Sequence, residues 1–459
     1  MFKSARLAIS SAVLAAGIAV SGVAGVALAA DRPPSVLVIT VDTLRTDRMS
    51  GYGYERSTSP RIDDLMSRGT KFSDARTIEP LTNPALSSML TGLLPHEHAA
   101  SRNGLRIKEG LDSLPKILAR NGWRTAAVVA NWTLKENISG LGEHFEDYVE
   151  VFTRRRWFGI VNSEATAEDV TDEAVEWLGR HLDGREPRPF LLWVHYVEPH
   201  APYVFHEEFA QRLGIEGHDP PRSDRYDTEI AEVDQQIGRL LDRVEGRIEG
   251  DRVIIVFTAD HGESLGEHGE WGHGRDLYEP GLRIPMSFTW QGTVEQQVVE
   301  SPAHIIDIPS TVLGLLGLPV PPSFRGVSWT AALRGRDRPA ERPVCYQAHR
   351  GAVHGASESD RARSKGLLEV GIITGGRKEI LNVNKNVRQL FDLAHDPREL
   401  HTLVAPSSTP SPELIRCVGE ISEGLGSLDR LTTKKLDAET VEQLRTLGDL
   451  EEPPGRRSS

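Results

Sequence analysis

Three short apolar runs, each followed at once by polar side chains, constrain this chain more than any other feature of its sequence. They cover residues 35–41, 190–197 and 253–257 and are rich in Val, Ile and Leu. Runs this short and this apolar predict strands that are buried on both faces of a parallel sheet. In open α/β sheets, ligands collect at the carboxyl ends of the strands. The residues that follow the runs are therefore the first candidates for a functional site.

Acidic and imidazole side chains gather after the third run. It leads directly into Asp260-His261, and His268 and His273 follow shortly afterwards among several glycines. Such a segment is costly to order without a ligand, which favours a metal-binding turn over a simple polar turn. Asp42 follows the first run in the same way, so the two carboxylates could hold one cation between two strand tips. The alternative is that Asp42 only caps the next turn.

Residues 260–279, DHGESLGEHGEWGHGRDLYE, resemble the second metal motif of the sulfatase family, within the alkaline phosphatase superfamily. Asp42 matches the family's metal-binding aspartate after the first strand, while Thr43 stands where many members have a second one. The ligands that the resemblance implies for one divalent ion are Asp42, Asp260, His261 and Thr82. Zn²⁺, Mn²⁺ and Ca²⁺ all remain open, and the imidazole favours Zn²⁺ or Mn²⁺.

A helix is predicted to begin near Pro84 and to end at Gly92. Its apolar residues recur at helical spacing, and Asn83 is a suitable capping residue. Thr82 lies just before this helix, where free N–H groups and the helix dipole favour a bound anion.

The same stretch resembles the sulfatase signature C-x-P-x-R followed by L-x-T-G. Thr82 occupies the position of the Cys or Ser that matures to formylglycine, and Leu86 occupies the position of the Arg. Because that maturation needs Cys or Ser, no formylglycine is expected. A Thr here resembles the phosphoryl-transferring relatives, such as phosphoethanolamine transferases, which implies that the Thr82 hydroxyl is the nucleophile. The alternative is a plain hydroxyl at the start of a helix.

The resemblance also implies two catalytic histidines. The pattern H-Y-x-x-P-H-x-P-Y at residues 195–203 is similar to the family's substrate-histidine motif and nominates His200. His195 lies inside the predicted strand and is interpreted as a core residue. His273 stands where many sulfatases have a Lys, and both His200 and His273 would act on the leaving group and the transferring oxygens. Asn131 stands where many members have a Lys-containing motif.

The order of elements predicts an α/β fold. Apolar strands alternate with amphipathic helical segments, such as residues 163–181 and 226–244, so we expect a large mixed, mostly parallel sheet sandwiched by helices. The resemblance adds a smaller C-terminal α+β domain. The expected divisions are a catalytic α/β domain at 30–340, a C-terminal subdomain at 341–450 and a disordered tail at 451–459.

The N-terminus has the composition of a targeting segment. Lys3 and Arg6 precede an apolar stretch over residues 7–26, which ends in Ala-Leu-Ala. We therefore expect a signal peptide at 1–29 and an exported protein, periplasmic or secreted. A run of about twenty apolar residues also allows an uncleaved membrane anchor. An oxidising compartment would permit Cys345 and Cys417 to pair, and the sequence leaves that open.

These features predict an exported, metal-dependent hydrolase of sulfate or phosphate (di)esters with a Thr nucleophile. Phosphoryl chemistry is favoured, because a Thr ester lacks the self-cleaving route of a formylglycine hemiacetal. Formylglycine-independent sulfuric ester hydrolysis, a phosphoethanolamine- or phosphoglycerol-type transferase and a catalytically degenerate binding protein are the alternatives. The expected partner is a sulfated or phosphorylated small molecule, glycan or lipid head group. A net charge of −13 argues against a nucleic-acid surface.

Overall fold

The central sheet carries the three predicted strands side by side. The computed structural model describes residues 32–152, 154–156, 161–184, 188–351 and 366–428, and the chain from Pro33 onward forms one compact unit. The sheet comprises β1 (Ser35–Val41), β2 (Thr70–Arg76), β3 (Arg124–Val129), β4 (Asp147–Glu150), β7 (Phe190–Tyr196), β8 (Val253–Ala259), β11 (Arg283–Thr289), β12 (Gln297–Val299) and β13 (Ala303–His304). The expected signal peptide and tail lie outside the described residues.

The strand order is β12-β2-β11-β8-β1-β7-β3-β4, with β13 also paired to β2. Five neighbouring strands, from β8 to β4, run parallel, while β11 is antiparallel to both β8 and β2. The prediction of a mixed, mostly parallel sheet is thus confirmed. Val41 lies opposite both Tyr196 and Ala259 in the register. The residues that follow β1, β7 and β8 are therefore brought to one edge of the sheet.

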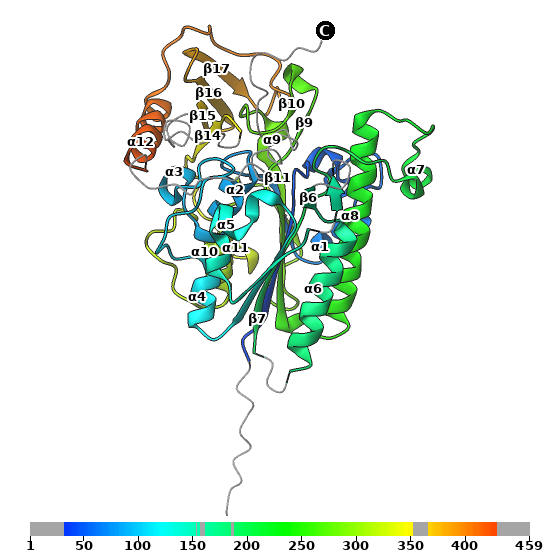
Figure 1. Ribbon diagram of the computed structural model, residues 1–459. Helices are drawn as coiled ribbons and strands as arrows, with labels where there is room; N and C mark the ends of the chain where they lie inside the picture. The colour runs from blue at the N-terminus through cyan, green and yellow to red at the C-terminus, as the bar shows by residue number, and fades with distance from the viewer. Residues whose placement is uncertain (1–31, 153, 157–160, 185–187, 352–365, 429–459) are drawn as a thin grey trace, which may run out of the picture. The chain divides into compact units, whose positions relative to one another are not determined.

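Helices cover both faces of the sheet, which is why every residue of β1, β7 and β8 is buried. Figure 1 shows α1 (Pro60–Ser67), α6 (Ala167–Leu182) and α8 (Arg222–Glu245) on one side of it, with α2 (Thr82–Thr91), α4 (Leu114–Arg120), α10 (Asp307–Leu315) and α11 (Thr330–Leu333) on the other. The helix expected from residue 163 begins at Ala167, because the Thr166 hydroxyl accepts from the Asp169 N–H and caps it there. Among the described residues, no helix has the length and hydropathy needed to cross a bilayer.

A smaller antiparallel sheet forms the C-terminal region. It consists of β14 (Cys345–His349), β15 (Leu367–Thr374), β16 (Arg377–Asn382) and β17 (Val387–Asp392), with α12 (Pro412–Leu428) packed against it (Figure 1). A disulfide between Cys345 and Cys417 joins β14 to α12. The boundary expected near residue 340 stays a prediction, because this sheet belongs to the same compact unit as the central one.

The remaining elements are short. They are α3 (Pro95–His98), α5 (Glu136–Ser139), α7 (Glu207–Leu213), α9 (Glu279–Leu282), β5 (Arg154–Arg156), β6 (Val161–Glu164), β9 (Ser264–Leu265) and β10 (Trp271–Gly272). The strands β9 and β10 form a two-stranded antiparallel hairpin directly after β8.

Buried charges attach the C-terminal sheet to the rest of the fold. Lys378 of β16 has its Nζ 3.0 Å from Glu279 Oε1 and 2.6 Å from Glu399 Oε1. Arg76 of β2 binds the same Glu279 carboxylate through two hydrogen bonds. Burial raises the pKa of Glu279, but the facing Arg76 and Lys378 cations outweigh it and hold that pKa well below its ordinary value. A second attachment joins His349 and Gln347 of β14 to the buried carboxylate of Glu79.

The disulfide should stabilise the fold without contributing to turnover. Replacing both cysteines (Cys345→Ser with Cys417→Ser) removes a cross-link that closes a 72-residue separation, and such links typically contribute about 2–4 kcal/mol. We expect a lower midpoint of thermal unfolding for the double variant and nearly unchanged ester hydrolysis below that midpoint. A folded double variant that had lost all activity would contradict this.

Two buried histidines outside the strand tips predict acid sensitivity. Burial lowers the pKa of His98 to about 3 and that of His144 to about 4, from an ordinary value of about 6.5. Between pH 6.5 and 4 the unfolded chain therefore binds more protons than the native one. The stability contributed by each neutral imidazole is present above pH 6.5 and is lost as the pH falls, by about 1.4 kcal/mol per pH unit. Denaturant titrations at several pH values in this range give the free energy of unfolding at each pH. This free energy should fall less steeply with decreasing pH for His98→Gln than for the wild type.

Candidate active site

Two buried carboxylates stand at the tips of adjacent parallel strands. Asp42 follows β1 and Asp260 follows β8, and neither side chain is exposed. Asp260 Oδ1 accepts from the Thr43 N–H (3.1 Å) and the His261 N–H (2.7 Å), whereas Oδ2 has no hydrogen-bond partner among the described residues. The side-chain amide of Asn131, at the end of β3, donates to Asp42. Because burying two carboxylates this close is costly, the arrangement favours a bound cation.

His261 adds a nitrogen donor to this acidic pair. Its Nδ1 lies 2.9 Å from the Gly262 carbonyl, which can only accept, so Nδ1 carries the proton of the neutral ring. Burial lowers the pKa of His261 to about 4, although Asp260 opposes the shift, and the ring is neutral at pH 7. Its Nε2 lone pair faces Asp42 Oδ1 at 3.7 Å and Asp260 Oδ2 at 3.5 Å. A lone pair facing two carboxylates is the donor set of a divalent metal site.

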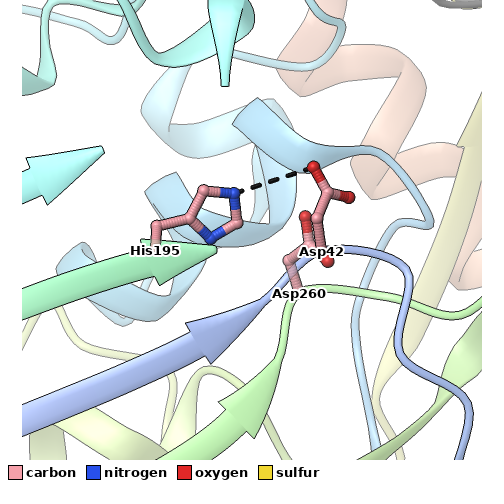
Figure 2. Close-up of side chains that lie close together, drawn as sticks. All are labelled: Asp42, His195 and Asp260. Atoms are coloured by element: carbon pink, nitrogen blue, oxygen red, sulfur yellow. Dashed lines mark ion pairs between the residues drawn. The ribbon is translucent and has the colours of Figure 1, made fainter. Parts of the chain in front are cut away.

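His195 lies in the same cluster, although its place inside a strand suggested a core residue. Figure 2 shows its imidazole directed at Asp42, with Nε2 3.7 Å from Oδ2, and Asp260 beside them. One atom from each of the three side chains lies within 4.8 Å of the other two. The strand pairing explains this: His195 lies opposite Thr40 of β1, and Asp42 follows Thr40 by two residues, just beyond the end of that strand. A polar residue on that face points toward the carboxylate.

Thr82 is the first residue of α2 and is 1% exposed. Its Oγ1 lies 3.4 Å from His261 Nε2, which brings the hydroxyl to the metal-binding cluster. The prediction that Asn83 caps this helix is wrong. Its side-chain amide donates to the Leu105 carbonyl instead, and its N–H donates to Asn103. The helix start therefore has fewer free N–H groups for an anion than the sequence suggested.

His273 and His200 complete the group of predicted residues. The His273 ring centroid lies 4.5 Å from that of His261 and 5.1 Å from that of His200. His273 Nδ1 is 3.2 Å from Glu263 Oε1. Burial raises the pKa of Glu263, but the imidazoles of His273, His200 and His261 outweigh it and leave that pKa below its ordinary value. An ionised Glu263 thus orients His273, a contact that sequence reasoning missed.

Both turns that carry the ligands are held by neighbouring elements. Thr43 adopts φ +54°, a left-handed conformation that is unfavourable for a β-branched residue. Its carbonyl accepts from the Tyr226 hydroxyl of α8 at 2.6 Å, and this turn aims the Thr43 N–H at Asp260. On the other turn, a Cβ on Gly262 would lie 1.9 Å from the Pro280 carbonyl oxygen, so only glycine fits there.

The structure brings together all the residues predicted for the site. The sequence nominated Asp42, Thr82, His200, Asp260, His261 and His273, and it missed His195 and Glu263. The position of the signature Arg holds Leu86, which is buried in the core. At the position of the missing Lys-containing motif, Asn131 contacts Asp42.

This fold, with its cluster of acids, imidazoles and a hydroxyl at the strand tips, defines a hydrolase of the alkaline phosphatase superfamily. A family model described as Sulfatase matches residues 34–318, and one described as N-sulphoglucosamine sulphohydrolase, C-terminal, matches residues 266–414. The chain therefore belongs to the sulfatase family.

Individual relatives are distant in sequence. The choline-sulfatase of Rhizobium meliloti (strain 1021) is 24% identical, with 81% of this chain and 82% of the relative covered. A protein solved in complex with its substrate D-glucosamine-2-N,6-O-disulfate has a TM-score of 0.65 and 19% identity, covering 87% of this chain and all of that one. The phosphonate monoester hydrolase of Agrobacterium radiobacter has a TM-score of 0.64 and 18% identity, covering 86% and 96%. The two solved structures show that the fold is shared.

Metal content should depend on the strand-tip cluster. We expect dialysed wild type to retain about one divalent ion per chain, and Asp260→Ala and His261→Ala to lose most of it, because each removes a buried donor. Elemental analysis of the three proteins measures this. His206→Ala is the control for metal bound elsewhere. His206, Glu208 and Glu232 form a second group of possible ligands, whose donor atoms lie within 4.8 Å of one another. Equal metal in wild type, Asp260→Ala and His261→Ala would exclude the strand-tip site.

Proposed function

We propose that this chain is a metal-dependent hydrolase of phosphate or sulfate esters in which Thr82 is the nucleophile. The observation that carries the proposal is the 3.4 Å separation of the Thr82 hydroxyl and His261 Nε2, beside two buried carboxylates. If the only role of Thr82 were to begin a helix, its hydroxyl would not need to face a cluster of metal-binding side chains. The position of Thr82 in the family signature supports the same role.

The donor set fits a divalent metal ion. Asp42, Asp260 and His261 would hold it, Thr82 would join them through its hydroxyl, and His195 is a further candidate ligand. When bound, such an ion lowers the pKa of a coordinated hydroxyl and offsets charge on the transferring oxygens. Two carboxylates with imidazole nitrogen suit Zn²⁺ or Mn²⁺ better than Ca²⁺.

The side chains of the protein account for the remaining chemistry. Thr82 Oγ1 gives its proton to solvent water and attacks the phosphorus or sulfur in line, and the bond to the leaving oxygen breaks. His273, oriented by Glu263, is placed to give a proton to that oxygen. His200, whose ring stands beside His273, is placed to bind the transferring oxygens. Water then attacks the Thr82 ester, which regenerates the hydroxyl and releases phosphate or sulfate.

The nature of the nucleophile favours phosphoryl transfer. A formylglycine hemiacetal can expel sulfate by itself, whereas a Thr ester must be attacked by water at phosphorus or sulfur. The sulfatase signature is also altered at its Arg position, which holds Leu86. We therefore propose that phosphate mono- or diesters are turned over faster than sulfate esters.

A glycan substrate and an extracytoplasmic location complete the proposal. One structural neighbour was solved with a sulfated sugar as its substrate, which supports a sulfated or phosphorylated glycan here.

The disulfide between Cys345 and Cys417 supports an oxidising compartment, periplasmic or secreted. Fractionation of cells that express the full chain, with Edman sequencing of the product, tests export and cleavage after residue 29.

The decisive variants are at Thr82. Thr82→Ala should lower kcat by several orders of magnitude and leave fold and metal content largely unchanged, because it removes the attacking oxygen. Thr82→Ser should keep part of the activity, because the hydroxyl survives. Nitrophenol release from a phosphate monoester, a phosphodiester and a sulfate ester, with and without added metal, measures this and ranks the substrate classes. Thr125→Ala is a matched control expected to keep most activity, because this buried threonine lies near the start of β3 and its hydroxyl accepts from the Glu146 N–H.

Trapping the intermediate distinguishes an enzyme from a binding protein. Mass spectrometry of quenched turnover should find a phosphate- or sulfate-sized adduct on the peptide that contains Thr82. Wild-type rates in Thr82→Ala would show that water is the attacking group. No release of nitrophenol from any of the three esters would favour the degenerate binding protein.

A further inference from the structure

A cleft of about 990 Å³ opens beside the proposed catalytic residues. His273 and Glu263 stand at its inner end, and Tyr203, Arg222, Trp271 and Arg275 line it farther out. His273 contacts the cluster around Thr82 through His261, so whatever occupies the cleft lies next to the reacting group. A cleft of this size accommodates a sugar or a molecule of similar size.

Trp271 forms an aromatic surface in this cleft. It is 44% exposed, which is unusual for so large an apolar side chain. Trp271 belongs to β10, pairs with Leu265 of β9, and lies two residues before His273. Its ring packs on Gly266, where an added Cβ would lie 3.2 Å from it. The hairpin therefore holds the exposed ring at a set position relative to His273.

Two arginines of the cleft, Arg222 and Arg275, are available to a ligand. The guanidinium carbon of Arg222, from the start of α8, lies 5.0 Å from the Trp271 ring centroid. Arg222 has no carboxylate within ion-pair distance among the described residues. Arg275 is 4.0 Å from Glu270, and both side chains are about half exposed, so that pair is weak.

The charge of the cleft is opposite to that of the chain. Arg225 pairs with Asp219, and the buried Glu263 faces His273, so the two acids of the lining are compensated. Arg222 and Arg275 leave an excess of positive charge in a chain whose net charge is −13. A cationic cleft in an acidic protein attracts anionic ligands.

We propose that the cleft binds a sugar ring that carries a second acidic group besides the ester to be cleaved. The sugar packs against the exposed part of the Trp271 ring, and Arg222, which lies over the same ring, binds the second acid, a sulfate or a carboxylate. This inference rests on the proposed function, because it takes the reacting ester to lie at His273 and Thr82. Trp271 and Arg222 are binding residues and take no part in bond cleavage.

Direct binding tests the inference independently of turnover. Calorimetric titration of the metal-loaded protein uses D-glucosamine-2-N,6-O-disulfate and glucosamine 6-O-sulfate. It compares the affinity for a sugar that carries two acidic groups with the affinity for a sugar that carries one. A monosulfated disaccharide that contains glucuronate shows whether a carboxylate can replace the second sulfate. We expect at least one of the two diacidic probes to bind about tenfold more tightly than the monosulfate. Arg222→Ala should abolish that advantage, while Trp271→Ala should weaken all three probes.

The controls separate the subsite from general effects of charge and folding. Arg212→Ala removes an arginine that lies over an aromatic ring in the same way, 5.1 Å from Phe209, outside the cleft, and should bind the probes as the wild type does. If Trp271→Ala or Arg222→Ala fails to fold, Trp271→Leu and Arg222→Gln replace them, because each removes the aromatic ring or the charge and keeps a larger side chain.

Equal binding of all three probes by the wild type would overturn the inference, as would a diacid advantage that survived removal of the Arg222 charge. Nitrophenyl ester hydrolysis is measured alongside. If hydrolysis depends on Thr82 but the diacid advantage is absent, the subsite fails and the proposed function stands. If Thr82→Ala hydrolyses the esters as the wild type does, the proposed function fails, whatever the probes show.

Discussion

Two carboxylates buried side by side at the ends of β1 and β8 are the constraint on which the rest of the structure depends. Because β1 and β8 pair in parallel, Asp42 and Asp260 follow the two strands at the same position along the sheet. Neither carboxylate is exposed to solvent that could stabilise its charge. The backbone N–H groups of Thr43 and His261 offset part of that charge, and a divalent cation can offset the rest. The two turns that hold this arrangement are constrained. Thr43 adopts an unfavourable left-handed backbone conformation, and position 262 must be glycine because the backbone of Pro280 lies against it.

Other elements bring a hydroxyl and two imidazoles to this anionic centre. The start of α2 supplies the Thr82 hydroxyl, and the segments after β7 and β10 supply His200 and His273. The C-terminal sheet is linked to the loop before α2 through Glu79, three residues from Thr82. Burial raises the pKa of Glu79, although His349 opposes that shift. Packing of the small sheet thus bears on the position of Thr82.

The chain keeps the anionic centre of its family and changes the groups around it. By their resemblance to the family motifs, Thr82 stands at the position of the residue that matures to formylglycine, Leu86 at that of an arginine and His273 at that of a lysine. Relative to those motif positions, Leu86 lacks a permanent charge, Thr82 offers a plain hydroxyl, and His273 offers an imidazole, which can exchange a proton near neutral pH. The cationic side chains of the adjoining cleft, Arg222 and Arg275, lie farther from Thr82 and suit recognition of substrate.

The sequence by itself predicted the sheet and most of the side chains that the structure gathers at the strand tips. Short apolar runs predict buried strands, and polar residues that follow neighbouring parallel strands meet at one edge of the sheet. This reasoning identified Asp42, Asp260 and His261, and the family motifs added Thr82, His200 and His273. Only the tertiary structure decided the role of His195, because facing a carboxylate depends on which strand lies next to β1. Three other features likewise depend on long-range packing, which local sequence patterns do not encode. They are the hydrogen bonds that draw Asn83 away from capping, the contact of Glu263 with His273, and the disulfide between Cys345 and Cys417.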